Sequence, residues 1–259
     1  MRRMFCLLAI ALCSPAAQAD DGLDAAAIEA LALDIATRSD ARVAAVLPLI
    51  DGAGSKLLAL RSYLRSGCHL AARWSWTQEQ IAAYEGSAEQ DQLNAEIQRV
   101  REKFEQSNPG FQLFVNPQVR SLDVQLADWN RNESVAAASA RLLQDAVAHL
   151  GAAATDALRG APMLESFLKS YTPLPTPAVA APGLSPHGQA RAIDFQVHRG
   201  GEIIAGPDTQ TIGTVWEQGG WAARLDRAVR EAGSRFDGPL VSPHEPWHYS
   251  YAPVAVVDP

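Results

Sequence analysis

The chain has 259 residues, of which 47% are hydrophobic and 20% charged, and its formal net charge is −7. This acidic balance argues against nucleic acid or anionic lipid as a partner. The length suffices for one large domain or two small ones with a buried core.

The first 19 residues predict a secretory signal peptide. Two arginines precede an apolar run, and Ala17-Gln18-Ala19 is a small-residue cleavage pattern. The run is too short to span a membrane, and no later apolar run reaches membrane-spanning length. Leu12 is too bulky for a lipoprotein signal. We therefore expect cleavage after Ala19 and export of the mature protein to a bacterial periplasm or beyond.

Processing changes the charge and the cysteine content. The mature chain keeps 20 basic residues (22 minus two arginines) against 29 acidic ones, which gives a net charge of −9. Of the three cysteines only Cys68 remains, so no internal disulfide can form. The fold must then depend on its apolar core, even in an oxidising compartment.

Residues 20–110 predict a helical N-terminal region. Helical patterns cover roughly 24–50, 55–73 and 77–107. The last begins with a Thr77–Gln80 capping-box spacing and ends at Asn108-Pro109-Gly110. Its apolar stripe covers too few heptads for a coiled coil, so we expect it to face a core. The stripe consists of Ile81, Tyr84, Ala88, Leu93, Ile97, Val100 and Phe104.

Residues 111–259 have a different pattern, which predicts a second domain. A strand at 111–116 is followed by helices at 121–130, 132–149 and 162–171 and by a proline-rich loop at 172–186. A strand at 190–197 alternates apolar and polar residues, and a turn at 199–202 leads into 203–205. A helix at 214–232 and strands at 237–241 and 247–252 complete the chain. Together these elements predict an α+β fold with a small, mostly antiparallel sheet flanked by helices.

Residues 244–248 read His-Glu-Pro-Trp-His and match the zinc-binding pattern H-E-x-x-H. That motif requires both histidines on one face of a helix. Pro246 has no N–H, its ring clashes with an earlier carbonyl in a helix, and it favours extended angles at Glu245. The pattern is therefore not expected to form a zinc-binding helix.

Four metal-capable residues lie close to the predicted sheet, namely His187, Asp194, Glu245 and His248. Residues seven or three apart on an ideal strand face opposite ways, so these can converge only if the chain bends. Gly188-Gln189 and Pro246 permit such bends. Two histidines and one carboxylate make a catalytic zinc site with an open position for water. Zinc lowers the pKa of that water to about 7, so the remaining carboxylate can serve as base.

These residues also resemble a known family. Ser185-Pro-His187-Gly-Gln-Ala-Arg-Ala192-Ile-Asp194 is similar to the S-x-H-x-x-G-x-A-x-D signature of zinc D-alanyl-D-alanine peptidases, and Glu245-Pro-Trp-His248 to their E-x-W-H signature. The family includes VanY-type carboxypeptidases and VanX-type dipeptidases, and its superfamily includes lysostaphin-type enzymes and the hedgehog domain. The resemblance implies zinc binding by His187, Asp194 and His248, catalysis by Glu245, and no ligand role for His244.

A third motif is weaker. Arg120-Ser-Leu-Asp-Val-Gln125 resembles the family's R-S-x-x-x-Q, which implies that Arg120 binds a substrate carboxylate or stabilises an oxyanion. The resemblance also implies a substrate hydrogen bond from Ser185. It covers roughly residues 110–252. Ala190 replaces the usual glycine, residues 117–119 differ from the family's pattern, and the long stretch between Arg120 and His187 suggests an insertion.

The sequence thus predicts an exported zinc metallopeptidase that hydrolyses peptidoglycan stem peptides, with D-Ala-D-Ala carboxypeptidase activity favoured. An L,D- or D,D-endopeptidase is the close alternative. A zinc-stabilised cell-wall-binding module without catalysis is another, although the presence of Glu245 favours the enzyme. The helices before residue 110 have no counterpart in the family and leave open an assembly or scaffold role.

Overall fold

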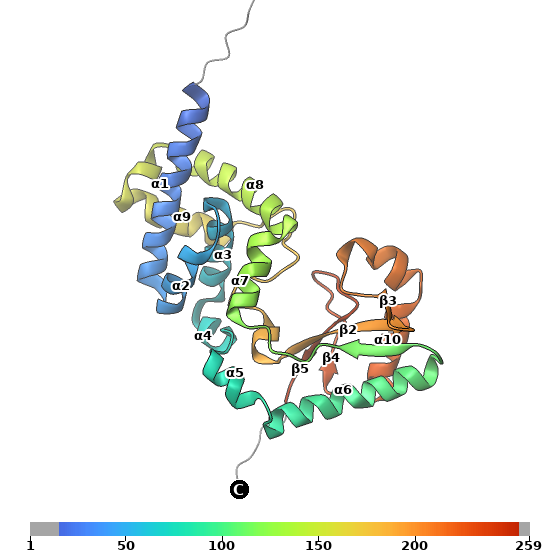
Figure 1. Cartoon of the computed structure of the whole chain (residues 1–259). Coiled ribbons are helices and arrows are strands. Elements are labelled where there is room, and N and C mark those ends of the chain that lie inside the picture. The colour runs from blue at the N-terminus through green and yellow to red at the C-terminus, as the bar shows by residue number, and fades with distance from the viewer. Residues whose placement is uncertain (1–15, 254–259) are drawn as a thin grey trace, which may run out of the picture.

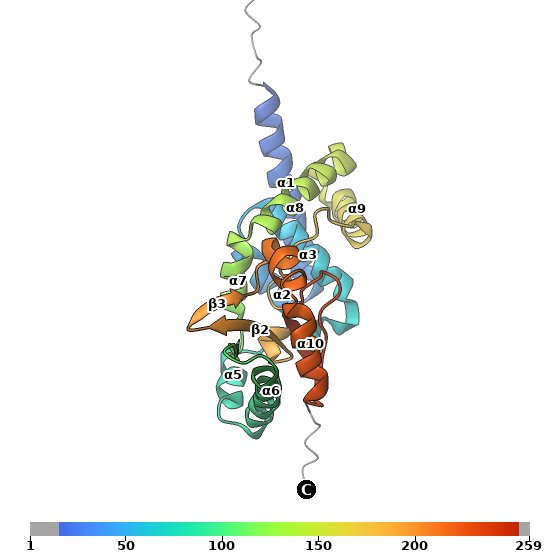
Figure 2. The same ribbon diagram turned by 90° about the vertical axis from the view of Figure 1, so that its right-hand side faces the viewer.

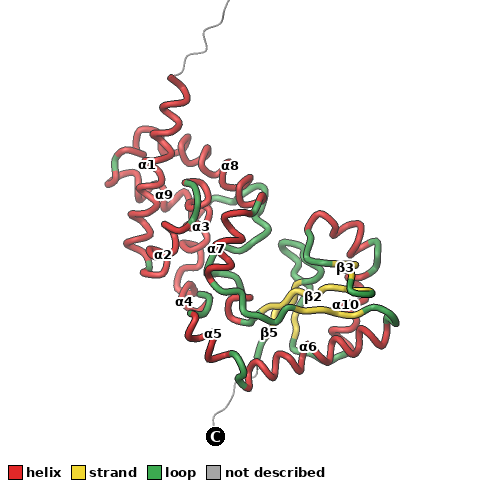
Figure 3. The backbone as a smooth tube through the Cα atoms, in the orientation of Figure 1, coloured by secondary structure: helices red, strands yellow, loops and turns green. Residues whose placement is uncertain are grey.

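The computed structural model describes residues 16–253, and these form an α+β protein with a small antiparallel sheet (Figures 1 and 3). The helices are α1 (Ala16–Ser39), α2 (Ala41–Val46), α3 (Ala53–Ser66), α4 (Leu70–Arg73), α5 (Gln78–Tyr84), α6 (Ala88–Ser107), α7 (Leu122–Arg131), α8 (Glu133–Leu150), α9 (Ala157–Ser170) and α10 (Trp221–Glu231). The strands are β1 (Gln112–Val115), β2 (Ala192–Arg199), β3 (Glu202–Ala205), β4 (Phe236–Asp237) and β5 (His248–Tyr251).

The apolar side chains form two separate cores. One core joins α1–α4 with α7–α9, which we call the helical body. The other joins α6 and α10 with the sheet, which we call the sheet body. Figures 1 and 2 show the two bodies next to each other. The chain starts in the helical body, enters the sheet body with α6 and β1, goes back to the helical body with α7–α9, and ends in the sheet body. Each core therefore contains residues from before and from after residue 110.

The stretch between Arg120 and His187 forms the second part of the helical body, with α7, α8 and α9. Its helix α8 packs directly on α3, and a Cβ at Gly54 would lie 2.5 Å from the carbonyl oxygen of Ser139. The two backbones therefore touch at Gly54, where no larger residue fits. The predicted insertion thus shares a core with the N-terminal helices.

The helix expected over residues 77–107 is two helices. Thr77 starts α5 with the predicted capping box, but Gly86 has φ +74° and ends the helical path. Ser87 then caps α6, since its hydroxyl accepts a hydrogen bond from the N–H of Gln90. An uninterrupted helix was thus the wrong prediction here, because Gly86 permits a left-handed turn and Ser87 supplies a new cap.

Other boundaries differ from the sequence prediction by a few residues. The helix expected at 162–171 starts at Ala157, because Asp156 caps it by accepting from the N–H groups of Leu158 and Arg159. The helix expected at 214–232 is a π-helical turn, Ile212–Glu217, followed by α10 after Gly220. The patterns at 24–50 and 55–73 correspond to α1–α2 and α3–α4 respectively, although α1 begins earlier, at Ala16, and each pair has a break between its helices.

The sheet has the order β1-β2-β5-β4, and β3 pairs with the far half of β2. All pairings are antiparallel, and β2 is the central strand. Ile193, Phe195 and Val197 point into the core with α6 and α10, as the alternation predicted. Gly200 and Gly201, with φ of 59° and 87°, make the predicted hairpin turn. The opposite face of β2 is left for polar groups.

The predicted signal peptide falls largely outside the described residues, which begin with the first turn of α1 at Ala16. Within residues 16–253, no helix combines the length and apolar character that crossing a bilayer requires.

Candidate metal centre

Three of the four predicted metal-site side chains converge on one point. His187 lies on a short 3-10 turn, Pro186–Gln189, Asp194 lies on β2, and His248 begins β5. Asp194 and His248 are direct cross-strand partners, so their side chains share one face of the sheet. One donor atom from each of the three residues lies within 4.8 Å of the others, and the group can hold a metal ion.

The distances between the donors are equal to or slightly shorter than those around a tetrahedral ion. His187 Nε2 lies 3.2 Å from His248 Nδ1 and 3.4 Å from Asp194 Oδ2, and His248 Nδ1 lies 3.0 Å from Asp194 Oδ1. An ion with metal–donor bonds of about 2.0–2.2 Å and tetrahedral angles separates its donors by about 3.3–3.5 Å. Two imidazoles and a carboxylate arranged in this way suit a transition-metal ion with one position open.

The bend that brings His187 to Asp194 depends on two tight positions. Ala190 adopts the left-handed conformation, with φ +53°, and is the single non-glycine residue with positive φ among residues 16–253. At Gly188 a Cβ would lie 2.1 Å from the hydroxyl of Ser75 and 2.6 Å from the amide nitrogen of Gln125. Gly188 therefore permits close packing against the helical body, while Ala190 turns the chain into β2.

The stretch containing Glu245 is a turn and not a helix, as Pro246 predicted. The N–H of Glu245 donates to the carbonyl of Leu240, and the N–H of His248 donates to that of Glu245. The Glu245 carboxylate is largely buried and lies 3.8 Å from His248 Nδ1. His244 points elsewhere, because its Nε2 lies 2.9 Å from Glu217 Oε1 on the surface. Of the two histidines in the apparent H-E-x-x-H, only His248 joins the donor group.

Burial and charge set the protonation states that a metal ligand set needs. Burial alone would raise the pKa of Asp194, but its hydrogen bonds with His187 and His248 lower that pKa well below the usual range. Burial lowers the pKa of His187 despite the neighbouring carboxylate. Asp194 is therefore ionised and His187 neutral near pH 7, which are the forms that bind metal.

The pKa of Glu245, unlike that of Asp194, is raised. Burial raises the pKa of its carboxyl group, and the charge of Asp194 raises it further, against opposing effects of His248 and Arg120. A raised pKa makes a carboxylate a better proton acceptor near neutral pH. Its place beside the donor group suits a general base.

Arg120 lies at the edge of the donor group. Its Nη2 is 3.2 Å from Asp194 Oδ2, and its backbone N–H donates to the carbonyl of His187. Its side chain is 37% exposed, so solvent or a ligand can reach it. Ser185 is buried at the start of the His187 turn, where its carbonyl accepts from the N–H of Gly188. Arg120 and Ser185 therefore both lie within segments that build the site.

Gln125 has a role that the sequence motif alone did not indicate. Its side-chain nitrogen donates to the carbonyl of Arg120 and to the hydroxyl of Ser75, and its oxygen accepts from the N–H of Gly183. The side chain is buried on α7. It connects α7 to the segment before α5, to the segment of Arg120 and to the end of the proline-rich loop. A glutamine among the apolar residues of that amphipathic helix was the signal available in the sequence.

The face of β2 that carries the donor group continues away from it through Gln196 and His198. Both side chains are half-buried, in contrast to Val197 between them, which is buried. Phe114 on β1 is 44% exposed and stacks on His198, with ring centroids 5.1 Å apart. This face therefore presents polar and aromatic groups in line with the metal centre.

No family model matches the chain, and no curated protein or solved structure is significantly similar to it. The functional assignment therefore depends on the residues and on their geometry.

Ala190→Gly tests the strained bend. Glycine relieves a left-handed conformation that costs alanine about 1 kcal/mol or more, which offsets the loss of one buried methyl group, worth about 0.8 kcal/mol. Ala192→Gly is the matched control, because Ala192 is equally buried but lies within β2. In urea denaturation we expect Ala190→Gly to be at least about 1 kcal/mol less destabilising than Ala192→Gly. Equal losses for the two variants would contradict the account.

Gln125→Leu tests the connection between the bodies. The change keeps most of the side-chain volume but leaves buried polar groups on Ser75, Arg120 and Gly183 without this partner. We expect a loss of about 3 kcal/mol in the free energy of unfolding. Gln98→Leu, on the exposed side of α6, should cost less than about 0.5 kcal/mol. A similarly small effect at Gln125 would show that the network contributes little.

His187→Ala tests the donor group. Removal of one of three protein ligands should reduce bound metal, measured by elemental analysis of the purified protein, from one equivalent to below about a tenth. His244→Ala should keep the full equivalent, because that side chain contacts Glu217. Metal loss on His244→Ala would restore the H-E-x-x-H interpretation.

Proposed function

We propose that this protein is an exported zinc metallopeptidase with a hedgehog/D,D-peptidase-like catalytic region, and that it hydrolyses peptidoglycan stem peptides. One observation carries the proposal. The two segments that resemble the family's signatures come together so that His187, Asp194 and His248 surround a single point, with Glu245 beside it. The predicted signal peptide supports a periplasmic or extracellular location, and the acidic charge gives no support to a nucleic-acid partner.

Zinc is the metal that this donor set suits best, and a zinc ion there would polarise a carbonyl oxygen and lower the pKa of a water molecule to about 7. The Glu245 carboxylate accepts the proton of the attacking water and later donates it to the leaving amine nitrogen. Its raised pKa and its buried position both favour this exchange near neutral pH.

Arg120 supports carboxypeptidase action on D-Ala-D-Ala. A partly exposed guanidinium beside the donor group can bind the terminal carboxylate of a substrate through paired N–H donors. That contact would place the last peptide bond of the chain next to Glu245. The fixed position of the Arg120 backbone, which is hydrogen-bonded to His187 and Gln125, limits the motion of this group.

The open face of β2 favours the second candidate, an L,D- or D,D-endopeptidase. Gln196, His198 and Phe114 form a polar and aromatic surface beyond the metal centre, where a longer peptide can lie. A non-catalytic zinc-stabilised binding module needs the same donors but has no need of a buried carboxylate with a raised pKa beside them. Glu245 therefore favours an enzyme over that module.

Glu245→Gln tests the catalytic role. The amide keeps the shape of the side chain but cannot accept the proton, so we expect muropeptide cleavage to fall by at least about 100-fold while zinc stays bound. Glu217→Gln is the matched control, because that carboxylate contacts His244 on the surface, and it should keep full activity. Undiminished cleavage by a zinc-loaded Glu245→Gln variant would remove Glu245 from the mechanism.

The same digestion separates the candidate functions. Release of D-alanine from disaccharide pentapeptides indicates a carboxypeptidase, whereas conversion of cross-linked dimers into monomers indicates an endopeptidase. If the zinc-loaded wild type cleaves neither substrate but binds intact sacculi, the binding module is correct.

A further inference from the structure

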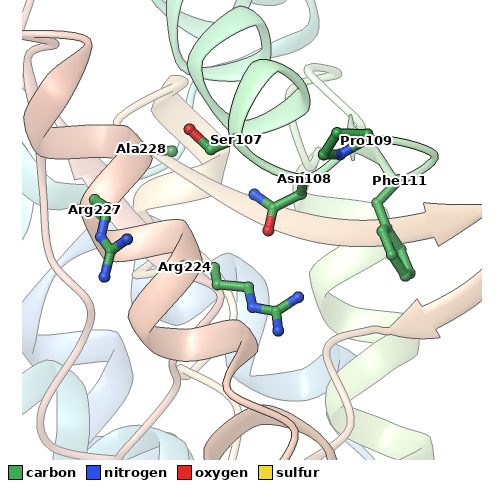
Figure 4. A pocket seen from close by; sticks show the side chains of 7 residues that line it. All are labelled: Ser107, Asn108, Pro109, Phe111, Arg224, Arg227 and Ala228. Atoms are coloured by element: carbon green, nitrogen blue, oxygen red, sulfur yellow. The ribbon is translucent and has the colours of Figure 1, made fainter.

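A pocket of about 390 Å³ lies between the end of α6 and the side of α10 (Figure 4). Helices α6 and α10 cover the face of the sheet that buries Ile193, Phe195 and Val197. The metal donors occupy the opposite face, so the pocket is separate from the metal centre. Its wall includes Ser107 at the end of α6, Asn108 and Phe111 from the turn after it, and Arg224 and Arg227 from α10.

The pocket concentrates basic side chains. Arg224 and Arg227 are three residues apart on α10 and so lie on one helical face. Arg199 adjoins them, since its guanidinium carbon lies 5.2 Å from the centre of the Phe111 ring. Within residues 16–253, none of these three guanidinium groups forms an ion pair or a side-chain hydrogen bond.

Two neighbouring arginines do form ion pairs. Arg230, on the next turn of α10, pairs with Asp226, and Arg235 pairs with the buried Glu96. The whole chain is acidic, with a formal net charge of −7. An acidic composition does not by itself lead to a cluster of guanidinium groups without ion pairs, so the cluster is a specific feature of this surface.

Aromatic rings hold two of the guanidinium groups in place. The guanidinium carbon of Arg224 lies 4.5 Å from the centre of the Trp221 ring, and the rings of Trp221 and Phe111 are 4.6 Å apart. Arg199 lies over Phe111 as described above. Stacking of this kind orients a guanidinium plane and leaves the N–H groups at its edge available to an oxyanion.

Stabilisation of the α6 C-terminus does not account for this charge. The carbonyl end of a helix carries roughly half a negative charge. Asn108 already donates its side-chain amide to the carbonyl of Phe104 in that last turn. Three guanidinium groups exceed what the remaining carbonyl groups can balance, so the pocket has an excess of positive charge.

We propose that this pocket binds a small ligand with two phosphate groups, held by Arg224 and Arg227 and assisted by Arg199. The guanidinium edge matches the oxygens of phosphate in pairs, and each phosphate carries at least one negative charge. The volume is at the lower end of the range for ligand sites, about 300–1,000 Å³, which suits a diphosphate with a small body. The same chemistry is offered by a free diphosphate and by phosphate-bearing lipid headgroups. The proposal does not depend on the metal centre.

Calorimetric titration of the full-length wild type with inorganic pyrophosphate tests the pocket. We expect binding that is at least ten-fold weaker in the double variant Arg224→Gln/Arg227→Gln. Arg230→Gln is the matched control on the same helix, since its guanidinium is already paired with Asp226, and it should change the affinity by less than two-fold. Pyrophosphate also binds metal ions and could bind at the metal centre. The criterion is therefore the difference in pyrophosphate affinity between the double variant and Arg230→Gln, measured on variants of equal thermal stability.

Sedimentation with vesicles of cardiolipin, a lipid with two phosphates, against phosphatidylcholine vesicles, distinguishes the source of the phosphate. Pyrophosphate binding that the double variant loses supports the proposal with a soluble ligand. Sedimentation with cardiolipin vesicles, without pyrophosphate binding, that the double variant loses supports it with a lipid headgroup. Absence of both interactions, or equal binding by the wild type and the double variant, overturns it.

Discussion

The buried carboxylate of Asp194 is the group on which the rest of the site depends. Its side chain is only 18% exposed and lies on the central strand of the sheet. A buried charge is stable only when it is paired and hydrogen-bonded. His187, His248 and Arg120 surround it within 3.4 Å. Arg120 is the one guanidinium group in contact with this carboxylate, and a bound cation would add to the compensation.

The helical body holds this arrangement in place from outside the sheet. Gln125 bonds to the Arg120 carbonyl and to Ser75, and Gly188 packs against the same two side chains. The turn that presents His187 is thus fixed by contacts that come from α7 and from the segment before α5. In this way the helical body has a structural connection to the candidate metal centre. Rigid support of this kind is what a precise ligand geometry requires.

Local patterns predicted much of the molecule. Alternation along β2, the glycine pair of the hairpin and the capping box at Thr77 each depend on neighbouring residues, and the structure has all three. The convergence of His187, Asp194 and His248 followed from metal chemistry and the resemblance to known signatures. The effect of Pro246 on the apparent helical motif was equally local.

Other features could not be predicted from these patterns. An apolar stripe shows that a helix is buried but not which partner buries it, so the packing of α7–α9 on the N-terminal helices was not expected. The break at Gly86 depends on a balance between a long apolar pattern and one left-handed residue. The three-way contact of Gln125 joins segments far apart in the sequence. Each of these features is a property of the tertiary structure.

X-ray absorption spectroscopy at the zinc edge of the purified mature protein tests the central claim most directly, because it identifies both the metal and its ligands. The account predicts one tightly bound zinc ion with two imidazole nitrogens at about 2.0–2.1 Å and one carboxylate oxygen at about 2.0–2.2 Å. The absence of stoichiometric zinc, or a spectrum with a sulfur ligand from Cys68, would contradict it.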